Sequence, residues 1–176
     1  MKTTNRVGAA EFRQACSQFA TGVTAVTAVD ASGAVAALAV NSFTSVSLDP
    51  AQVLVCIGVG TSSYPVLSRA ERLAVHVLAA EQGELARRLA TSGLSGEERL
   101  AGVPWRAGEG GEPLLPGAAA CFAGPITQRV PSGDHLIFIV EVDHVENGDA
   151  CSGALTYHRG SFSVIPAQDR TKGEGR

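Results

Sequence analysis

The chain has 176 residues, which is enough for one domain with a sizeable core but cramped for two. Hydrophobic residues make up 45% and charged residues 18%, a balance typical of a globular protein rather than a disordered one. The net charge of −3 argues against a general binder of nucleic acid or of membrane surfaces, so an anionic ligand would need a local site.

The apolar runs and the two ends of the sequence bear on membrane association, localisation and the bounds of the domain. The apolar runs of the middle are far shorter than the ~20 residues that a membrane-spanning helix needs. No signal-peptide pattern opens the sequence, so we expect a cytoplasmic protein without a membrane partner. We expect flexible ends at 1–8 and 167–176 and a single domain over 9–166.

The first part of the domain passes from helical to strand-like sequence. Phe12, Cys16 and Phe19 recur at helical spacing, which predicts a helix over 9–20. β-branched residues and turn signals then predict strands at 23–29, 34–40, 41–48 and 52–57. A loop at 58–63 precedes a short helix that begins near Pro65, because proline is favoured in the first helical turn.

The rest of the domain is again mostly strand-like. It predicts a strand at 73–78, a helix at 81–90 and a long surface excursion at 91–113. Strands at 118–130 and 135–146 are joined by a hairpin turn, and 154–165 is predicted to close the sheet. Six to eight strands in hairpin order, with three scattered helices, favour a mainly β fold, a closed or nearly closed antiparallel barrel.

The cysteines argue against a zinc site. Cys16, Cys56, Cys121 and Cys151 lie far apart with no CxxC pair, whereas zinc sites draw on closely spaced ligands. We therefore predict no metal. Cys16 and Cys56 stand in apolar patterns, which predicts buried, reduced thiols.

The segment from Asn41 to Ser47 is the densest polar stretch inside strand-like sequence. An edge strand with a solvated face would explain it. A binding wall would explain it equally well, because hydroxyls and exposed backbone groups can pair with the rim of a flat heteroaromatic ring. Burying such a ring without those partners would cost on the order of 1–3 kcal/mol per unmet group.

A glycine- and hydroxyl-rich loop, Gly58 to Ser63, follows a strand and precedes a helix. It lacks the third glycine and the βαβ setting of a dinucleotide-binding turn, so a Rossmann site is disfavoured. A phosphate site remains open, because glycines allow close approach and hydroxyls donate hydrogen bonds. An ordinary loop in which Ser62 or Ser63 caps the helix is the alternative.

Three further places carry imidazole or guanidinium groups. His135 opens a run of five apolar residues after the turn residues Gly133 and Asp134, and it has either a structural or a catalytic role. No GxSxG motif accompanies it, so hydrolase chemistry is poorly supported. His76 alternates with valines, which favours a hydrogen-bonded core or interface histidine. Arg159, in the sequence YHRG, is part of a polar hairpin rim or binds an anion.

Taken together, these segments resemble the flavin reductase family, the small reductase components of two-component flavin monooxygenases, which have the FMN-binding split-barrel fold. The resemblance runs from about Phe12 to about Phe162, nearly the whole chain. It rests on five segments in the family's order: FATGVT (19–24), NSFTSVSLDP (41–50), VLVC (53–56), GDH (133–135) and YHRG (157–160). The fold implied is an antiparallel split β-barrel over 9–166.

The resemblance also implies roles for particular residues. The isoalloxazine ring of FMN or FAD would be lined by Asn41, Ser42, Phe43, Thr44 and Ser45. The flavin phosphate would be held by Gly60, Thr61, Ser62 and Ser63, and the cofactor would also be approached by Leu89 and Ala90. His135 would lie by the nicotinamide of NAD(P)H as the catalytic residue, and Asp134 and Arg159 complete the predicted cofactor-binding set.

The reaction implied is hydride transfer from NADH to FMN or FAD, with NADPH less favoured because no arginine cluster awaits a 2′-phosphate. A homodimer would shape the flavin sites, and reduced flavin would diffuse to a partner monooxygenase or halogenase. The alternative is a split barrel that binds flavin without turning over NAD(P)H. Val140, which stands where the family usually has glycine, keeps that alternative open.

Overall fold

A computed structural model describes residues 7–148 and 153–167 of the chain. The ends predicted to be flexible, at 1–8 and 167–176, lie almost entirely outside the described residues, and so does Cys151.

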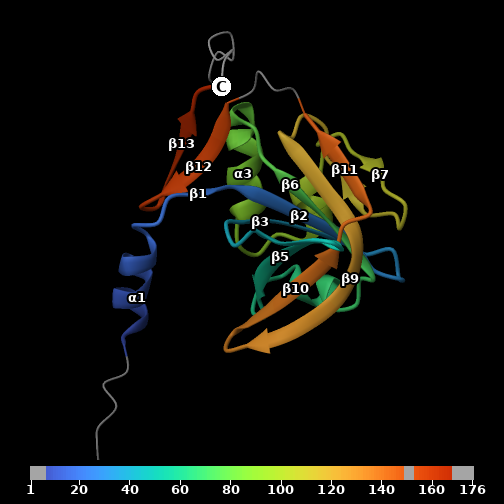
Figure 1. Ribbon diagram of the computed structural model, residues 1–176, viewed down its shortest axis with the longest axis horizontal. Helices are drawn as coiled ribbons and strands as arrows, with labels where there is room; N and C mark the ends of the chain where they lie inside the picture. Colours follow the sequence, from blue (N-terminus) through green and yellow to red (C-terminus); the bar gives the residue numbers. More distant parts are fainter. Residues whose placement is uncertain (1–6, 149–152, 168–176) are drawn as a thin grey trace, which may run out of the picture.

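The described residues form a curled sheet with short helices around it (Figure 1). The strands are β1 (Thr21–Gly22), β2 (Thr24–Val29), β3 (Val35–Val40), β4 (Thr44–Leu48), β5 (Ala51–Gly58), β6 (Arg72–Val77), β7 (Arg106–Ala107), β8 (Pro113–Leu114), β9 (Ala120–Ser132), β10 (His135–Glu141), β11 (His144–Asn147), β12 (Ala154–His158) and β13 (Ser161–Ile165). The helices are α1 (Ala9–Cys16), α2 (Tyr64–Leu67), α3 (Gly83–Ala90) and α4 (Gly96–Leu100), and a 3₁₀ turn (Ala80–Gln82) precedes α3.

The main sheet is antiparallel throughout and runs in the order β3-β2-β6-β9-β10-β5-β4, with β11 also paired to β9. Its path begins and ends at β3 and β4, which are consecutive in the chain. The sheet therefore curls round until its two edges approach without joining. This arrangement is a split barrel, and it confirms the mainly β antiparallel fold predicted from the sequence.

The prediction that 154–165 closes this sheet is wrong. β12 and β13 instead pair with β1 in a separate three-stranded sheet, and a single bridge between Ala79 and Ala154 links it to the chain that follows β6. A period-two pattern identifies a strand and its buried face, but it does not identify the strand's neighbour.

The long strand β9 connects the two halves of the barrel (Figure 1). Its first half pairs with β6 and β11, and its second half pairs with β10. Gly124 lies where the partners change, and a Cβ there would be 1.9 Å from the carbonyl oxygen of Glu141. This close approach requires glycine. The single strand predicted at 135–146 is divided into β10 and β11 at the same place.

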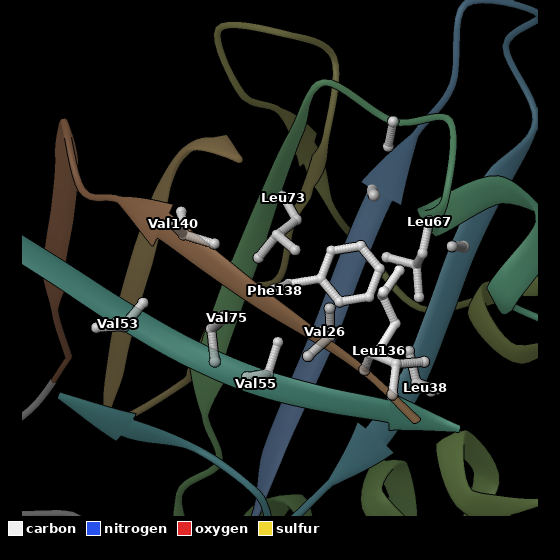
Figure 2. Close-up of a cluster of buried hydrophobic side chains, with 14 residues drawn as sticks. Val26, Leu38, Val53, Val55, Leu67, Leu73, Val75, Leu136, Phe138 and Val140 are labelled. Atoms are coloured by element: carbon white, nitrogen blue, oxygen red, sulfur yellow. The ribbon is translucent and has the colours of Figure 1, made fainter. Parts of the chain in front are cut away.

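The barrel core is a cluster of aliphatic side chains gathered around Phe138 (Figure 2). Val55, Leu73 and Val26 come from different strands and pack around the ring. Val140 is fully buried in this core and is paired with Val53 of β5. Each such side chain contributes about 1.5–3 kcal/mol on burial. The valine at position 140 therefore fills the barrel core.

A second cluster lies between the sheet and the helices α3 and α4. It includes Val23, Ala25, Leu89 and Leu100. Because β2 has the barrel core on one face and this cluster on the other, the strand is buried along nearly its whole length. By contrast, β5 alternates between buried and partly exposed positions, as a strand with one buried face should.

The predicted surface excursion at 91–113 is wrong in part, because this segment contributes to the interior. It forms α4, and Arg99, Leu100 and Glu112 within it are buried. Ser95 caps α4 by accepting a hydrogen bond from Glu98 N–H at 3.2 Å, and the Glu98 carboxylate accepts one from Ser95 N–H at 2.7 Å. This is the reciprocal cap that a Ser-x-x-Glu sequence indicates.

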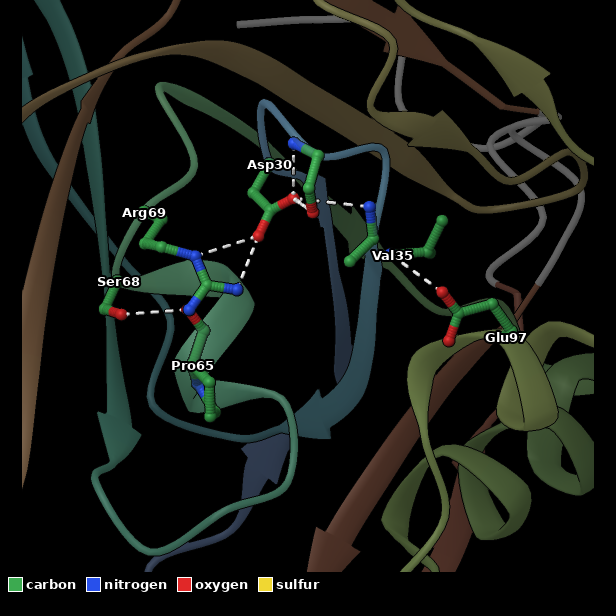
Figure 3. A network of polar contacts seen from close by, with 8 residues as sticks. Asp30, Val35, Pro65, Ser68, Arg69 and Glu97 are labelled. Carbon is green, nitrogen blue, oxygen red and sulfur yellow. Dashed lines mark hydrogen bonds and ion pairs between the residues drawn. The ribbon is translucent and has the colours of Figure 1, made fainter.

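The turn between β2 and β3 is closed by Asp30 (Figure 3). Its carboxylate accepts hydrogen bonds from the hydroxyl and N–H of Ser32 at 2.5 and 2.9 Å, and from Nε and Nη2 of Arg69 at 3.0 and 2.6 Å. The hydrogen bonds from Ser32 and Arg69 lower the pKa of Asp30 to about 2. This turn lies between the strands predicted at 23–29 and 34–40 and confirms the turn signals there.

The first helix is shorter than predicted and less buried. It ends at Cys16, and none of its residues is buried. Figure 1 shows it standing away from the barrel. The prediction of a buried Cys16 is wrong, because helical spacing places apolar residues on one face but does not provide the surface that covers it. Cys56 is half-buried.

Candidate functional site

Two adjoining pockets lie beside the end of β3, each with a volume of about 230 Å³. The apolar pocket is lined by Val23, Ala39, Val40, Asn41, Ala90, Tyr157 and Phe162. The polar pocket is lined by Leu38, Ala39, Gly60, Thr61, Ser62, Leu89, Ala90, Ser92, Gly93 and Arg99. Because Ala39 and Ala90 line both, the two pockets form one continuous candidate site with an apolar and a polar part.

An aromatic pair forms one wall of the apolar pocket. Tyr157 of β12 and Phe162 of β13 are cross-strand partners, and their ring centroids lie 5.4 Å apart at an interplanar angle of 59°. The guanidinium of Arg87 lies 5.8 Å from the centre of the Phe162 ring. Ala39 and Val40 of β3 line the same pocket, so its apolar and aromatic surface suits a flat aromatic ligand. The YHRG segment thus brings Tyr157 to the pocket.

The polar stretch that begins at Asn41 has a divided role. Only Asn41 lines the apolar pocket. The hydroxyl of Ser42 donates to the carbonyl of Cys56 at 3.0 Å and accepts from its N–H at 2.9 Å, which ties the β3–β4 connection to β5. Phe43 stacks on Phe122 with centroids 5.6 Å apart. The stretch therefore anchors the β3–β4 connection to β5 and presents one amide to the pocket.

Thr44 and Ser45 belong to β4, where they pair with Leu54 and Val53 of β5. Both are exposed at the edge of the sheet, and neither lines the pockets. Their contact with a flavin stays a prediction.

The polar pocket is built on the loop that follows β5. Thr61 Oγ1 donates to the carbonyl of Gly58 at 3.0 Å, and Ser62 Oγ donates to the carbonyl of Leu94 at 2.7 Å. The second bond joins this loop to the loop between α3 and α4. Ser63 is buried, occupies the N-cap position of α2 without a side-chain cap, and donates to Ala37 O at 3.2 Å. Simple helix capping therefore does not explain the hydroxyls.

The two loops of the polar pocket also supply backbone donors. The N–H groups of Gly60, Ser62, Ser92 and Gly93 have no hydrogen-bond acceptor among residues 7–148 and 153–167. Gly93 has a φ of +82°, a conformation that favours glycine. Unpaired N–H groups gathered on glycine-rich loops are typical of an anion site.

Sequence reasoning missed Arg99, which lines the same pocket. Its Nη1 donates to Ala37 O at 2.8 Å and to Ser63 Oγ at 2.9 Å, while Nη2 and Nε donate to Thr91 O at 2.8 and 3.3 Å. Burial lowers the pKa of this guanidinium. The available signal was the Ser-x-x-Glu sequence that starts α4, which predicts a helix around this arginine.

The predicted residues at the end of α3 reach the site. Leu89 lines the polar pocket and packs into the cluster beneath it, and Ala90 lines both pockets. Asn41, Gly60, Thr61 and Ser62 are thus brought together with them, as the sequence led us to expect. Their binding of a cofactor stays a prediction.

His135 lies next to the site rather than in the lining of either pocket. It pairs with Gly58 across β5 and β10, and a Cβ at Gly58 would be 3.6 Å from its Nε2 and 3.6 Å from Thr61 Cγ2. Its Nδ1 donates to the Asp134 carboxylate at 2.7 Å, and in the neutral ring Nε2 is then the acceptor. This bond lowers the pKa of Asp134.

Arg159 does not line either pocket. It lies in the β12–β13 turn with a φ of +48°, and its guanidinium donates to Gln18 Oε1, which ties the turn to the end of α1. Its role in binding an anion stays a prediction.

Two further findings concern the described part of the chain. No group of three or more His, Cys, Asp and Glu side chains is placed there to hold a metal ion. No helix there is long and apolar enough to cross a membrane.

Comparison with known proteins decides the family. The family model described as "Flavin reductase like domain" matches residues 16–166. The chain belongs to the flavin reductase family. The NADH-dependent FMN reductase AsuE2 of Streptomyces nodosus subsp. asukaensis is 38% identical over 162 residues, which cover 90% of this chain and 85% of AsuE2.

A second flavin reductase relative is much longer. The probable flavin reductase of Rhizobium meliloti is 39% identical over 150 residues, 85% of this chain but only 47% of the relative. The chain thus spans about half of that protein. Among solved structures, one match is BorF, the flavin reductase component of a bacterial two-component tryptophan halogenase; the match covers 92% of this chain and 100% of the BorF chain. Its TM-score is 0.83 and its identity 35%.

Proposed function

We propose that this flavin reductase transfers a hydride from NADH to FMN or FAD and releases the reduced flavin to a partner monooxygenase or halogenase. The observation that carries the proposal is the continuous site, in which an apolar aromatic pocket adjoins a pocket of unpaired N–H groups and one guanidinium. A flavin nucleotide has the matching parts, a flat ring and a phosphate. The names of AsuE2 and BorF support the same activity.

The residues of the site fit such a ligand. Tyr157 and Phe162 offer apolar and aromatic surface for the ring, and the side-chain amide of Asn41 can pair with its polar rim. Ser62 and Gly93 bring backbone donors to the phosphate end. The flavin and the nicotinamide supply the chemistry itself, since a hydride passes from one ring to the other.

The remaining task of the protein is to orient the nicotinamide, and we assign it to His135. Its ring is held by Asp134 and is 49% exposed, so Nε2 is available to a second ligand on the solvent side. The position opposite Gly58 places this ring close to the loop that carries Thr61. No group is needed to move a proton in the hydride step, so a positioning role is sufficient.

The site is open, which suits release of the product. Asn41, Ala90, Ser92 and Gly93 are exposed residues of the pocket walls. A flavin that binds as a co-substrate must leave after reduction, and a shallow site allows this. We further propose that release occurs by diffusion, in the cytoplasm, where NADH is available.

We also propose that the enzyme is a homodimer. Phe12 and Phe19 are 62% and 77% exposed near α1, and Leu48 is 95% exposed on the open edge of β4. Such apolar surface is typical of an interface. The test is the molar mass in solution by light scattering: a dimer is expected, and Leu48→Asp should shift it toward the monomer. A monomeric wild-type protein would contradict the proposal.

The alternative, flavin binding without NAD(P)H turnover, depended on Val140. This residue lies in the barrel core and lines neither pocket, so nothing at the site favours the alternative. One assay separates the two: NADH oxidation followed by absorbance, with and without added FMN or FAD. Flavin-dependent oxidation is expected. Flavin binding without oxidation would establish the alternative.

A further inference from the structure

Arg99 is a buried arginine whose hydrogen bonds go to neutral oxygen atoms. Its side chain comes from α4, is only 4% exposed, and reaches the polar pocket. Four of its N–H bonds are directed to neutral oxygens: Ala37 O, Ser63 Oγ and, twice, Thr91 O. A guanidinium has five such bonds, so one on Nη2 is left without an acceptor among the described residues.

Four other arginines of the described residues pair with acids, whereas Arg88 donates to the carbonyl of Glu98. Arg69, Arg72, Arg87 and Arg106 each pair with a carboxylate. Over the part of the chain that the structure describes, no carboxylate oxygen lies within 4.0 Å of Arg99. A buried cation without a counter-charge is costly, and proteins normally pair it.

The acids beside Arg99 in the sequence are engaged elsewhere. Glu97 accepts a hydrogen bond from the N–H of Val35 at 3.1 Å, and Glu98 accepts one from Ser95 N–H at 2.7 Å. The positive charge of Arg99 is therefore not offset by its own helix. It adds to the unpaired N–H groups of Ser62 and Gly93, which line the same pocket.

We propose that Arg99 recognises the flavin phosphate and makes the enzyme select phosphorylated flavins over riboflavin. The inference rests on the proposed function, because it places a flavin in the continuous site. The phosphate next to the ribityl chain, which FMN and FAD share, would supply the missing negative charge. Riboflavin has the same ring and ribityl chain but ends in a neutral hydroxyl, which cannot neutralise the guanidinium.

The test compares the binding of FMN and riboflavin by quenching of flavin fluorescence, without NADH. Wild-type protein should bind FMN at least about tenfold more tightly than riboflavin, as expected for a charge-assisted contact. Arg99→Gln should lose this preference while its Kd for riboflavin stays the same, and Arg99→Lys should retain part of it. Equal affinity of wild-type protein for the two flavins would overturn the proposal.

The matched control is Arg88→Gln, which removes the same charge from the neighbouring helix. Arg88 donates to the carbonyl of Glu98 and lines neither pocket, so this variant should keep the preference for FMN. If Arg88→Gln and Arg99→Gln weaken FMN binding equally, general charge explains the effect and the proposal is wrong. It is also wrong if Arg99→Gln weakens both flavins equally, because its role is then structural.

A second measurement is available if Arg99→Gln does not fold, since Arg99 also bonds to the sheet. Inorganic phosphate should raise the apparent Kd of wild-type protein for FMN and leave that for riboflavin unchanged. No competition, or equal competition against both flavins, would contradict the proposal. A protein that prefers FMN but does not oxidise NADH would keep this inference and reject the proposed function, so the two can fail separately.

Discussion

The edge strands β3 and β4 follow one another in the chain, yet the structure covers one and exposes the other. At β3, Glu97 accepts the hydrogen bond of Val35 N–H (Figure 3), and Arg99 and Ser63 donate to Ala37 O. At β4, Leu48 is almost fully exposed. An uncovered strand edge is a surface for pairing with another chain. One edge thus lines the candidate site, and the other is open to pairing with another chain, as the proposed dimer would require.

The covered edge should be the more sensitive of the two to substitution. A Cβ at Gly96 would lie 2.0 Å from the carbonyl oxygen of Val35, so Gly96→Ala should force α4 off β3. We expect the free energy of unfolding to fall by more than about 3 kcal/mol, because backbone cannot yield to such a clash. Denaturant titration measures the change.

Gly22→Ala is the matched control, since no atom lies within 4 Å of its added Cβ. It should change the free energy of unfolding by about 1 kcal/mol or less. If both variants are equally stable, α4 does not depend on its close contact with the sheet edge.

Acid should weaken the packing on the face of β6 that points away from the barrel core, rather than the two edges of the main sheet. His76 is buried, its Nε2 accepts from Leu115 N–H at 3.1 Å, and its Nδ1 faces Ala25 O at 3.3 Å. Burial lowers the pKa of His76 to about 4 from an ordinary value of 6.5. The unfolded chain takes up a proton near pH 6.5 and the folded chain near pH 4, so stability falls across that window, by about 3 kcal/mol in all.

Denaturation midpoints measured from pH 7 to pH 4 test this prediction. His76→Asn should be less stable at pH 7 and should lose most of the pH dependence in that window. An unchanged slope in the variant would show that other groups cause it.

His135 lies on β10, which is not an edge strand of the main sheet, and its side chain is half exposed. Its substitution should therefore change activity more than stability. His135→Ala should raise KM for NADH about tenfold, by loss of one hydrogen-bonding ring, with the Kd for flavin nearly unchanged. The free energy of unfolding should stay within about 0.5 kcal/mol, because the ring is half exposed. Unchanged steady-state kinetics with NADH would exclude the positioning role.

The smallest expected effect concerns the charge of Glu97 at the covered edge. The hydrogen bond from Val35 N–H lowers the pKa of Glu97 below its ordinary value of 4.5. Its stabilising effect is therefore present above that value and is lost as pH falls through the lowered folded-state pKa. Glu97→Gln keeps an acceptor and should cost only about 0.5 kcal/mol at pH 7. The same variant should be slightly less acid-sensitive than wild-type protein, which unfolding curves at pH 3 and pH 7 can check.

Much of the fold could be predicted because local patterns determine it. The strand predicted at 52–57 and the turn signals between the strands predicted at 23–29 and 34–40 are local properties, and the structure confirms both as β5 and the turn at Asp30. The partner of β12 could not be predicted, since pairing depends on contacts between distant segments. The exposure of Cys16 was missed because the face of α1 on which it lies is uncovered in a single chain.

The sequence predicted the loop that forms the polar pocket, but it did not predict which charged and polar side chains complete the candidate site. Glycines and hydroxyls at Gly60, Thr61 and Ser62 identified the polar pocket from one side. Arg99 comes from a segment rich in glycine and charge, and only the fold shows that its charge is buried without a partner. The pattern could not distinguish the role of Ser42 from that of Asn41, because only the fold shows that the Ser42 hydroxyl bonds to the backbone of Cys56 on β5.

The hydrogen bonds of Arg99 have one more consequence, for protein turnover. The loop that joins α3 to α4 is held at Thr91 O by this guanidinium and at Leu94 O by Ser62. A ligand in the polar pocket would bind only the folded loop, and at a hundred times its Kd it would stabilise that state by about 2.7 kcal/mol. Backbone amides from 91 to 99 should therefore exchange hydrogen more slowly when flavin is abundant, and proteases should cleave this loop mainly in its absence.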